Sequence, residues 1–259
     1  MQMNIDFVIQ GPYNDFTDEI VESYLKLSFV NKIIVSCWEC DKEKSVFSDK
    51  VEFVRSGEYK KYPGPANVNL QLTTSLAGVK KTTSDYVAKF RSDQLFDSDG
   101  IVEMYNFFVN NLKKDRIFII GNHYTLLFHP KDWVYWGYRE DMINLFDIPH
   151  ENNIVCEQLG INSGNYSYAM HLMTRPETYI GAHYCSRFDD RVKKMVDNEN
   201  QYLYDQSPNW SEAKEVSDEV TPRYFKSFPR KNIQMIWPKR NIYCLPVHPQ
   251  TEGWDEEGF

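Results

Sequence analysis

The stretch that decides the fold is Asp85-Tyr86-Val87-Ala88-Lys89-Phe90-Arg91-Ser92-Asp93-Gln94-Leu95-Phe96. Its first half is apolar and aromatic, which predicts a short buried strand, and the pattern stops abruptly at Arg91. Open α/β sheets bind ligands beyond the carboxyl ends of their strands, so we expect Arg91 and Asp93 at a ligand-binding edge. Carboxylate oxygens suit Mg²⁺ or Mn²⁺ and a guanidinium suits phosphate, which favours a metal–diphosphate site. The same pattern also fits a strand-end aspartate that caps the next helix and pairs with Arg91.

The segments around this stretch alternate between strand and helix patterns. Apolar runs predict strands at Ile5–Gln10, Lys32–Trp38, Val51–Val54 and Arg116–Ile120, and helical spacing predicts helices that contain Ile20–Leu27, Asn67–Lys81 and Ile101–Leu112. This order predicts an α/β fold with a doubly wound sheet and right-handed crossovers. In the helix over Asn67–Lys81, we expect a stripe of small and polar residues to lie close to a ligand: Asn67, Gln71, Ser75 and Gly78.

Beyond Gly121 the pattern is less regular. We expect a loop feeding a strand over His129–Gly137, a helix over Asp141–Phe146, a charged surface segment over Arg187–Asn198 and a late strand over Ile233–Trp237. Residues 205–231 are predicted to be rich in loops, and the acidic end Thr251–Phe259 to be mobile.

Composition narrows the class of protein. The chain has 259 residues, 42% of them hydrophobic and 15% aromatic, which is enough for a substantial core. A net charge of −8 argues against a nucleic-acid groove or a polybasic membrane patch, while a local basic pocket for phosphate remains compatible with it. No secretory signal or membrane span is visible, and five cysteines, an odd number, fit a reducing compartment. We therefore expect a soluble cytoplasmic protein.

Several common catalytic motifs do not occur in the sequence. The six histidines are scattered without an H-E-x-x-H pattern, and the signatures of serine hydrolases, P-loop enzymes and dinucleotide binders are missing. Cys37 and Cys40 have the spacing of a redox pair. Packing at the end of a strand is the preferred interpretation, with Trp38 and Glu39 near a ligand base.

Four ordered motifs resemble the WavE-type lipopolysaccharide synthesis family. They are Phe7–Pro12, Asn67–Gln71 leading into Ser75–Gly78, Lys89–Asp93, and Asp132-Trp133 with Gly137. Arg175–Ile180 is similar to a further element of that family, of the P-E-x-Y-I kind. The resemblance runs from about residue 5 to about residue 180, and the chain from about residue 185 matches nothing in the family pattern.

The resemblance implies a glycosyltransferase of bacterial surface polysaccharides with a GT-A-like fold, a Rossmann-type mixed sheet flanked by helices. It implies that residues 1–125 form a nucleotide-sugar-binding α/β half and that residues 126–259 form the less regular acceptor-side half of the same domain. In one respect the chain departs from the general GT-A pattern, because the metal motif D-x-D is replaced by Arg91-Ser92-Asp93. Either a divalent metal (Mn²⁺ or Mg²⁺) binds through Asp93, waters and the donor diphosphate, or Arg91 carries part of the diphosphate charge.

The predicted site residues fall into two groups. Those expected to hold the nucleotide-diphosphate sugar are Gln10, Gly11, Pro12, Trp38, Asn67, Asn69 and Gln71, with Arg91 and Asp93 on the diphosphate. The candidates for the catalytic base are Asp132 and Glu177. Asp132 is preferred because Trp133, Tyr135 and Trp136 would stack on an acceptor sugar. Plainer interpretations are that Asp132 caps a turn and that Glu177 is a buried partner of Arg175.

The expected partners are a nucleotide-sugar donor and a glycan acceptor, with no nucleic acid, no membrane span and peripheral membrane association left open. Two other functions stay in view. One is a catalytically inactive sugar-nucleotide-binding or assembly module. The other is a sugar nucleotidyltransferase, which normally carries a glycine- and lysine-rich loop after its first strand that Gln10–Asn14 lacks.

Overall fold

The computed structural model describes residues 3–39, 48–57, 67–122, 125–151, 175–203, 207–229, 233–238 and 242–246. Its strands are β1 (Ile5–Gln10), β2 (Val30–Trp38), β3 (Val51–Ser56), β4 (Tyr86–Arg91), β5 (Leu95–Phe96), β6 (Ile117–Ile119), β7 (Val134–Tyr138), β8 (Phe225–Ser227), β9 (Gln234–Trp237) and β10 (Ile242–Pro246). Its helices are α1 (Asp15–Tyr24), α2 (Val68–Lys81), α3 (Ser98–Asn111), α4 (Arg139–Phe146), α7 (Pro176–Cys185), α8 (Asp190–Asp197), α9 (Glu199–Tyr202) and α10 (Trp210–Tyr224).

The central element is a seven-stranded sheet in the order β3-β2-β1-β4-β7-β6-β8. Strands β3, β2, β1 and β4 run parallel to one another, and β7 runs antiparallel to both of its neighbours, β4 and β6. Strand β8 then pairs in parallel with β6 at the far edge. The predicted fold class, an α/β mixed sheet of the Rossmann type flanked by helices, is therefore confirmed.

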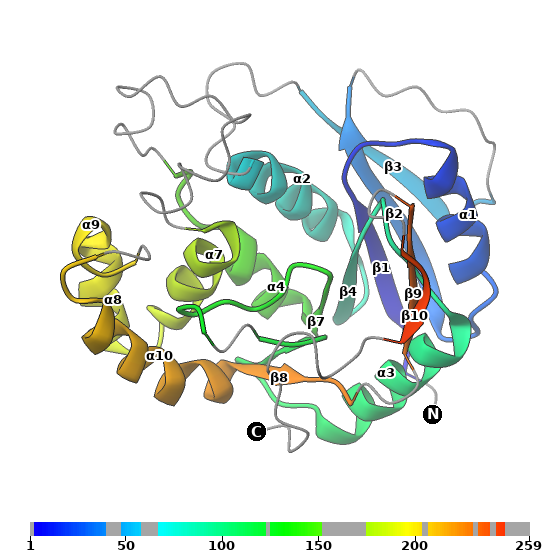
Figure 1. Cartoon of the computed structure of the whole chain (residues 1–259). Coiled ribbons are helices and arrows are strands. Elements are labelled where there is room, and N and C mark those ends of the chain that lie inside the picture. Colours follow the sequence, from blue (N-terminus) through cyan, green and yellow to red (C-terminus); the bar gives the residue numbers. More distant parts are fainter. Residues whose placement is uncertain are drawn as a thin grey trace.

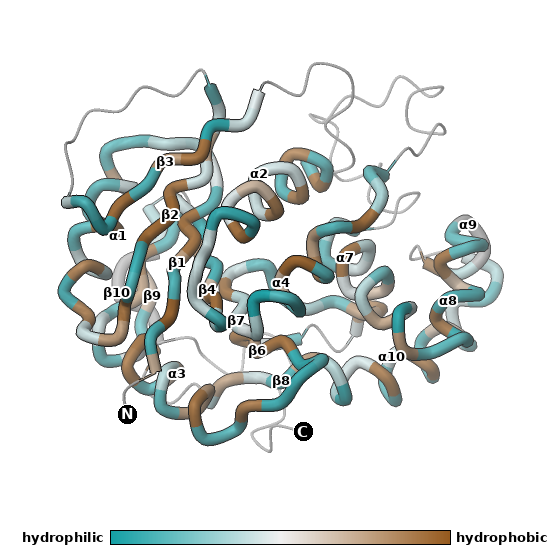
Figure 2. Tube along the Cα trace, turned by 180° about the vertical axis from the view of Figure 1, so that it is seen from behind, coloured by the Kyte–Doolittle hydropathy of each residue, from teal (hydrophilic) through white to brown (hydrophobic). Residues whose placement is uncertain are grey.

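Helices cover both faces of this sheet, with α2, α4 and α7 on one side and α1 and α3 on the other (Figure 1). Strand β1 serves both layers, since Phe7 and Ile9 pack in one hydrophobic cluster and Val8 in the other. A strand with a covered surface on each side reads as a continuous apolar run, which is why β1 was predictable. Helices α2, α8 and α10 instead alternate polar and apolar stretches, as helices with one buried face do (Figure 2).

Helix α2 lies very close to β1 and β2. A Cβ atom on Gly78 would lie 2.6 Å from Val8 Cγ1 and 2.9 Å from Ser36 Cβ, so only glycine fits at this crossing. The Ser36 hydroxyl donates to the carbonyl of Thr74 at 2.6 Å. The prediction that the small, polar stripe lies beside a ligand therefore needs correction at Gly78, where the stripe packs the helix onto the sheet.

A second, three-stranded antiparallel sheet has the order β10-β9-β5 and includes the end of the stretch Asp85–Phe96, because β5 follows β4 almost directly. The predicted late strand is present as β9, and the predicted helix over Asp141–Phe146 is present within α4. The prediction that residues 205–231 are rich in loops is wrong, because Trp210–Tyr224 form α10. Its buried residues Ala213, Val216 and Val220 recur at helical spacing on an otherwise polar segment.

The charged segment over Arg187–Asn198 contains α8, which buries Val192 and Met195 and exposes its other side. The prediction for Thr251–Phe259 falls outside the described residues. None of the helices in the described ranges combines the length and the apolarity that crossing a bilayer requires.

Candidate active site

The pairing of β4 with β7 brings together charged residues that are far apart in the sequence. Strand β4 ends at Arg91, and β7 starts at Val134, which is the direct partner of Phe90. Because the two strands are antiparallel, the residues just before β7 lie at the carboxyl end of β4. Asp132 therefore stands next to Arg91, at the edge of the sheet where a ligand site was predicted.

Arg91 is bound by two carboxylates. Its Nε and Nη2 donate to the two oxygens of Asp93 at 2.9 and 3.0 Å, and its Nη1 donates to Asp132 Oδ2 at 2.5 Å. Burial opposes the positive charge, but Asp132 and Asp93 more than offset this effect and raise the pKa of Arg91. The side chains of Arg91, Asp93 and Asp132 are 25%, 23% and 11% exposed to solvent, so the cluster is accessible from outside the protein. The ion pair between Arg91 and Asp93 that the sequence allowed is present.

Glu177 lies near the same cluster, in the first turn of α7 just after Pro176. Its Oε2 is 3.9 Å from Nε2 of His129, whose other ring nitrogen lies 3.4 Å from the Thr178 hydroxyl. Burial, with the negative charge of Asp132 adding to it, raises the pKa of Glu177 from 4.5 to about 7. Near neutral pH, the protonated and the ionised forms of this carboxyl group are therefore both populated.

Lys89 lies beneath the cluster on β4 and has no exposure to solvent. Its Nζ donates to the backbone carbonyl of Asp132 at 3.2 Å and lies 5.4 Å from the centre of the Tyr135 ring. Burial lowers the pKa of Lys89 to about 8, although Asp132 works against this shift. The lysine thus ties the segment that carries Asp132 to the central strand.

The aromatic run before and within β7 divides into a partly exposed residue and a buried pair. Trp133 is half-buried, whereas Tyr135 and Trp136 have no exposure. Tyr135 donates its hydroxyl to the carbonyl of Pro130 at 3.1 Å, inside the protein. The expectation that Tyr135 and Trp136 stack on an acceptor sugar is therefore wrong, because both rings belong to the core.

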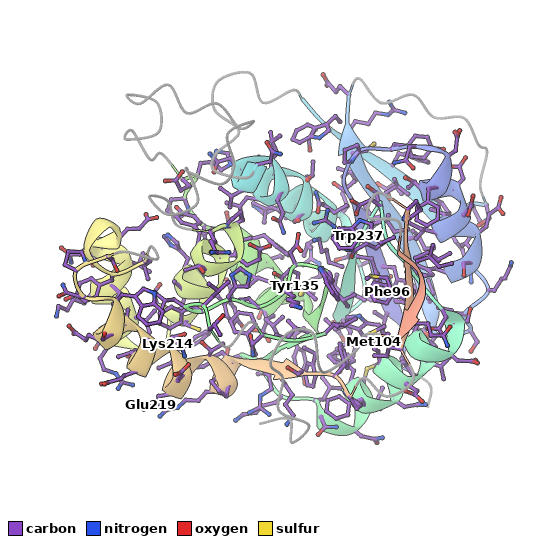
Figure 3. All side chains as sticks on the ribbon, in the orientation of Figure 1. Phe96, Met104, Tyr135, Lys214, Glu219 and Trp237 are labelled. Atoms are coloured by element: carbon purple, nitrogen blue, oxygen red, sulfur yellow. The ribbon has the colours of Figure 1, made fainter. Side chains whose placement is uncertain are left out.

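Trp237 is a site residue that the sequence analysis missed. It lies at the end of β9 (Figure 3). Its Nε1 donates to Asp93 Oδ2 at 3.3 Å. The Arg91 guanidinium lies 5.5 Å from the centre of its ring, and the Trp133 ring lies 6.0 Å away, edge to face. The sequence predicted a strand at this position, but nothing in the pattern connected that strand with Arg91 or Asp93.

The turn after β1 lies directly against the residues that follow β4. Gly11 has φ +134°, and a Cβ atom there would lie 2.4 Å from the Ser92 hydroxyl oxygen. Ser92 donates its backbone N–H to Gln10 at 2.9 Å and its hydroxyl to the carbonyl of Pro12 at 2.9 Å. The side chain of Gln10 donates to the Thr74 hydroxyl at 2.9 Å. The structure therefore brings the predicted Gln10–Pro12 turn next to Arg91 and Asp93.

The other predicted donor-site residues occupy different positions. Trp38 ends β2 and is half-buried, and exposed Asn67 precedes α2 in a left-handed conformation with φ 64°. Asn69 is fully buried, and its amide group both donates to and accepts from the main chain of Glu151 at 2.8 Å. Gln71 is half-buried, and its Nε2 has no hydrogen-bond partner among the described residues. Asn69 thus holds the chain at Glu151 rather than facing a ligand.

The protein groups at Asp93 do not form a metal site by themselves. Both oxygens of this carboxylate are bound by Arg91, and one also accepts from Trp237. Within the part of the chain that the structure describes, no group of three or more His, Cys, Asp or Glu side chains is arranged to hold a metal ion. Metal binding at Asp93 stays a prediction, because a donor diphosphate would have to supply further ligands.

A family model described as WavE lipopolysaccharide synthesis matches residues 5–213. The chain belongs to this family. The resemblance that the four ordered motifs indicated is therefore confirmed, but the match continues past residue 185, where none was expected. Arg91, Asp93, Asp132 and Glu177 all lie inside the matched region. Trp237 lies outside it. A search of curated proteins found no match to the chain.

Solved structures give only distant likenesses. A 4-diphosphocytidyl-2C-methyl-D-erythritol synthase from Anaerococcus prevotii is 8% identical with a TM-score of 0.39, over 62% of this chain and 85% of that one. TarS of S. aureus is 11% identical with a TM-score of 0.42, over 70% of this chain and 33% of that one. The glycosyltransferase GlyE of Streptococcus pneumoniae is 11% identical with a TM-score of 0.36, over 85% and 60%. Likenesses at this level carry no argument about activity.

Proposed function

We propose that this member of the WavE family is a glycosyltransferase, which moves a sugar from a nucleotide-diphosphate donor to a growing surface glycan of the lipopolysaccharide or capsule type. The observation that carries the proposal is the position of Arg91 at the carboxyl end of β4, bound by Asp93 and Asp132 and accessible to solvent. Family membership supports the glycan pathway. Ligands of open α/β sheets bind at this edge.

The donor would lie across the ends of β2, β1 and β4. In this arrangement Trp38 and the Gln10–Pro12 turn contact the nucleoside. The Arg91 guanidinium releases the carboxylate of Asp93 and binds the diphosphate in its place. A guanidinium can bind diphosphate oxygens with two parallel hydrogen bonds, as it binds this carboxylate. When a divalent metal is bound, it would neutralise the leaving diphosphate, with Asp93 as the protein ligand. Asn67 and Gln71 remain proposed contacts, and Asn69 a residue that positions them.

We favour Glu177 over Asp132 as the base that deprotonates the acceptor hydroxyl. Asp132 Oδ2 is already bound to the guanidinium of Arg91, so this oxygen is engaged in an ion pair and does not face an acceptor hydroxyl freely. Glu177 has a pKa near 7, and its side chain is 22% exposed. A general base works best when its pKa lies near the operating pH.

The proposed transfer forms one bond at the anomeric carbon of the donor sugar and breaks another. A carboxylate oxygen of Glu177 takes the proton of the acceptor hydroxyl, and the acceptor oxygen forms a bond to the anomeric carbon of the donor sugar. The bond from that carbon to the diphosphate oxygen breaks, and its electron pair leaves with the nucleoside diphosphate. Arg91 stabilises the charge that develops on this leaving group.

The test is to incubate the protein with UDP-, GDP-, CMP- and dTDP-linked sugars and to follow release of the free nucleotide, with Mn²⁺, with Mg²⁺ and with a chelator. The proposal is supported if the wild type releases a nucleoside diphosphate and Arg91→Gln lowers this release about a hundredfold or more. Arg191→Gln is the matched control, because Arg191 is likewise bound by two carboxylates, Asp189 and Glu219, but lies exposed on α8.

Other outcomes would assign other functions. Binding of a nucleotide-sugar without any turnover would favour an inactive binding or assembly module. Release of pyrophosphate from a nucleoside triphosphate and a sugar phosphate would favour a nucleotidyltransferase. If the chelator abolishes nucleotide release, the proposed metal at Asp93 is supported. If release is complete in the chelator, the proposed metal is excluded. Cell fractionation would test the proposed cytoplasmic location and any peripheral membrane association.

A further inference from the structure

Two tryptophans from distant parts of the chain meet beside the charged cluster. Trp133 precedes β7 and Trp237 ends β9, and their ring centres are 6.0 Å apart with planes inclined by 73°. Both side chains are half-buried. They therefore form a corner of two indole rings at the surface of the site, which we call the tryptophan corner.

Charged groups border this corner. The Lys131 ammonium lies 4.6 Å from the centre of the Trp133 ring, and the Arg91 guanidinium lies 5.5 Å from the centre of the Trp237 ring. The indole N–H of Trp237 donates to Asp93 at 3.3 Å. Cation–π contacts and this hydrogen bond hold the rings in place, so the corner is preorganised in the absence of a ligand.

The corner offers the two kinds of contact that a sugar ring needs. A pyranose has faces of C–H groups, which pack on aromatic rings, and an edge of hydroxyl groups, which bind charged side chains. Trp133 and Trp237 supply aromatic surface, and the carboxylate of Asp93, 23% exposed, supplies an acceptor close by, while Lys131 is buried against the Trp133 ring. Small-molecule sites in proteins combine aromatic walls with a few placed polar groups in this way.

The position of the corner in the sheet separates it from the nucleoside end of the site. The strand order is β2-β1-β4-β7, so the Gln10–Pro12 turn and Trp38 lie on one side of Arg91. Trp133 lies on the other side, at β7. A nucleotide-sugar that places its base near Trp38 and its diphosphate at Arg91 has its sugar end, and the acceptor, toward the corner.

We propose that Trp133 and Trp237 bind a pyranose ring, either the sugar of the donor or that of the acceptor. The inference rests on the proposed function for the identity of the ligand, but its geometry does not depend on Glu177. Trp237 lies beyond residue 213, where the match to the family model ends. The charged residues of the site, by contrast, all lie within the matched region. If the corner binds a sugar ring, Trp237 would contribute to the choice of that sugar.

The experiment observes the indole N–H signals of the tryptophans by two-dimensional NMR, assigned with the variants Trp133→Phe, Trp237→Phe and Trp210→Phe. Trp210 is the control, because it packs against the core from α10. The probes are methyl α- and β-hexopyranosides, the four nucleotide-sugars, and the corresponding free nucleotides. We expect the Trp133 and Trp237 signals to move with the glycosides or the nucleotide-sugars, and the Trp210 signal to stay.

Affinity measurements then assign the sugar. Trp237→Leu should weaken binding of the sugar that moves the signals about tenfold, and Trp237→Phe should retain most of it because an aromatic ring remains. Nucleotide release is then measured without an acceptor. If Trp237→Leu raises the KM for the nucleotide-sugar, the corner binds the donor sugar. An unchanged donor KM with weaker glycoside binding assigns it to the acceptor.

One result would overturn the inference. If both corner signals stay in place with every sugar while the protein still releases nucleoside diphosphate, the corner does not bind sugar and the proposed function stands. Because the titration uses the wild-type chain, it remains decisive even if Trp237→Leu fails to fold. If sugars move the signals of Trp133 and Trp237 and no nucleotide binds, the tryptophan corner is a sugar site but the proposed nucleotide-sugar donor is wrong.

Discussion

Replacing Glu177 by glutamine separates the proposed role of this residue as a base from the effect of its charge on stability. The side chain is 22% exposed and lies near Asp132, and its pKa is raised to about 7. Glutamine keeps the shape and removes both the charge and the titration. We expect nucleotide release to fall about a hundredfold or more, the usual contribution of a general base.

The size of the stability effect follows from the pKa. A rise from 4.5 to about 7 corresponds, at about 1.4 kcal/mol per pH unit, to about 3 kcal/mol for the fully ionised side chain. Partial exposure reduces this, so roughly 1 to 3 kcal/mol is expected. Because the folded protein holds this proton more tightly than the unfolded chain does, the stability is complete below pH 4.5. It declines as the pH rises to about 7 and stays reduced above that.

The assay is urea unfolding of the wild type and Glu177→Gln at pH 5 and pH 8, followed by circular dichroism. The variant should gain stability relative to the wild type by roughly 1 to 3 kcal/mol between these two pH values. Asp141→Asn is the matched control, since burial raises the pKa of Asp141 to about 6 at a site remote from Arg91. It should show a change of the same sign in stability and leave nucleotide release intact.

Two results would refute the reasoning about Glu177. A stability difference that does not change with pH would mean that this carboxyl group is not destabilised by its surroundings. Full nucleotide release by Glu177→Gln would mean that another group accepts the proton of the acceptor hydroxyl. In that case Asp132→Asn is the next variant to measure.

Three further predictions concern the framework around the site. Gly11→Ala should destabilise the protein by about 1 to 3 kcal/mol in urea unfolding, because of the positive φ and the contact with Ser92. Gly78→Ala should lower the melting temperature despite its better helix propensity, because its Cβ would clash with Val8; an unchanged or higher value would contradict this. For Asp6, burial raises the pKa but hydrogen bonds from Ser84, Asn31 and Thr83 lower it overall. Asp6→Ala should therefore lose stability mainly above pH 3.8, with the difference from the wild type shrinking as the pH falls further.

Local patterns predicted the first half of the fold well. Strands β1 and β4 begin and end where the apolar runs do, at Ile5–Gln10 and Tyr86–Arg91. Both are central parallel strands, which are covered on two faces and therefore read as continuous apolar segments. In contrast, α10 was missed because its few buried residues are surrounded by charges and Pro222 lies near its end.

The site was predictable only where its residues follow one strand. Arg91 and Asp93 come from a single turn of chain, so their pairing was visible in the sequence. The contact between Arg91 and Asp132 depends on the antiparallel register of β4 and β7, and the contact between Asp93 and Trp237 depends on where β9 docks. A single sequence does not contain these long-range pairings. The burial of Tyr135 was missed for the same reason, since hydrophobic pattern alone does not tell a wall of a pocket from a core residue.

The pairing of Phe90 with Val134 has a consequence for how such proteins can diverge. The distance between the guanidinium of Arg91 and the carboxylate of Asp132 is set by hydrogen bonds between two strands. The length of the chain that joins those strands, which includes α3 and β6, has no bearing on it. Insertions or deletions in the loop between α3 and β6 would leave Arg91, Asp93 and Asp132 in place. That loop is thus free to vary in length without separating the guanidinium of Arg91 from the carboxylate of Asp132.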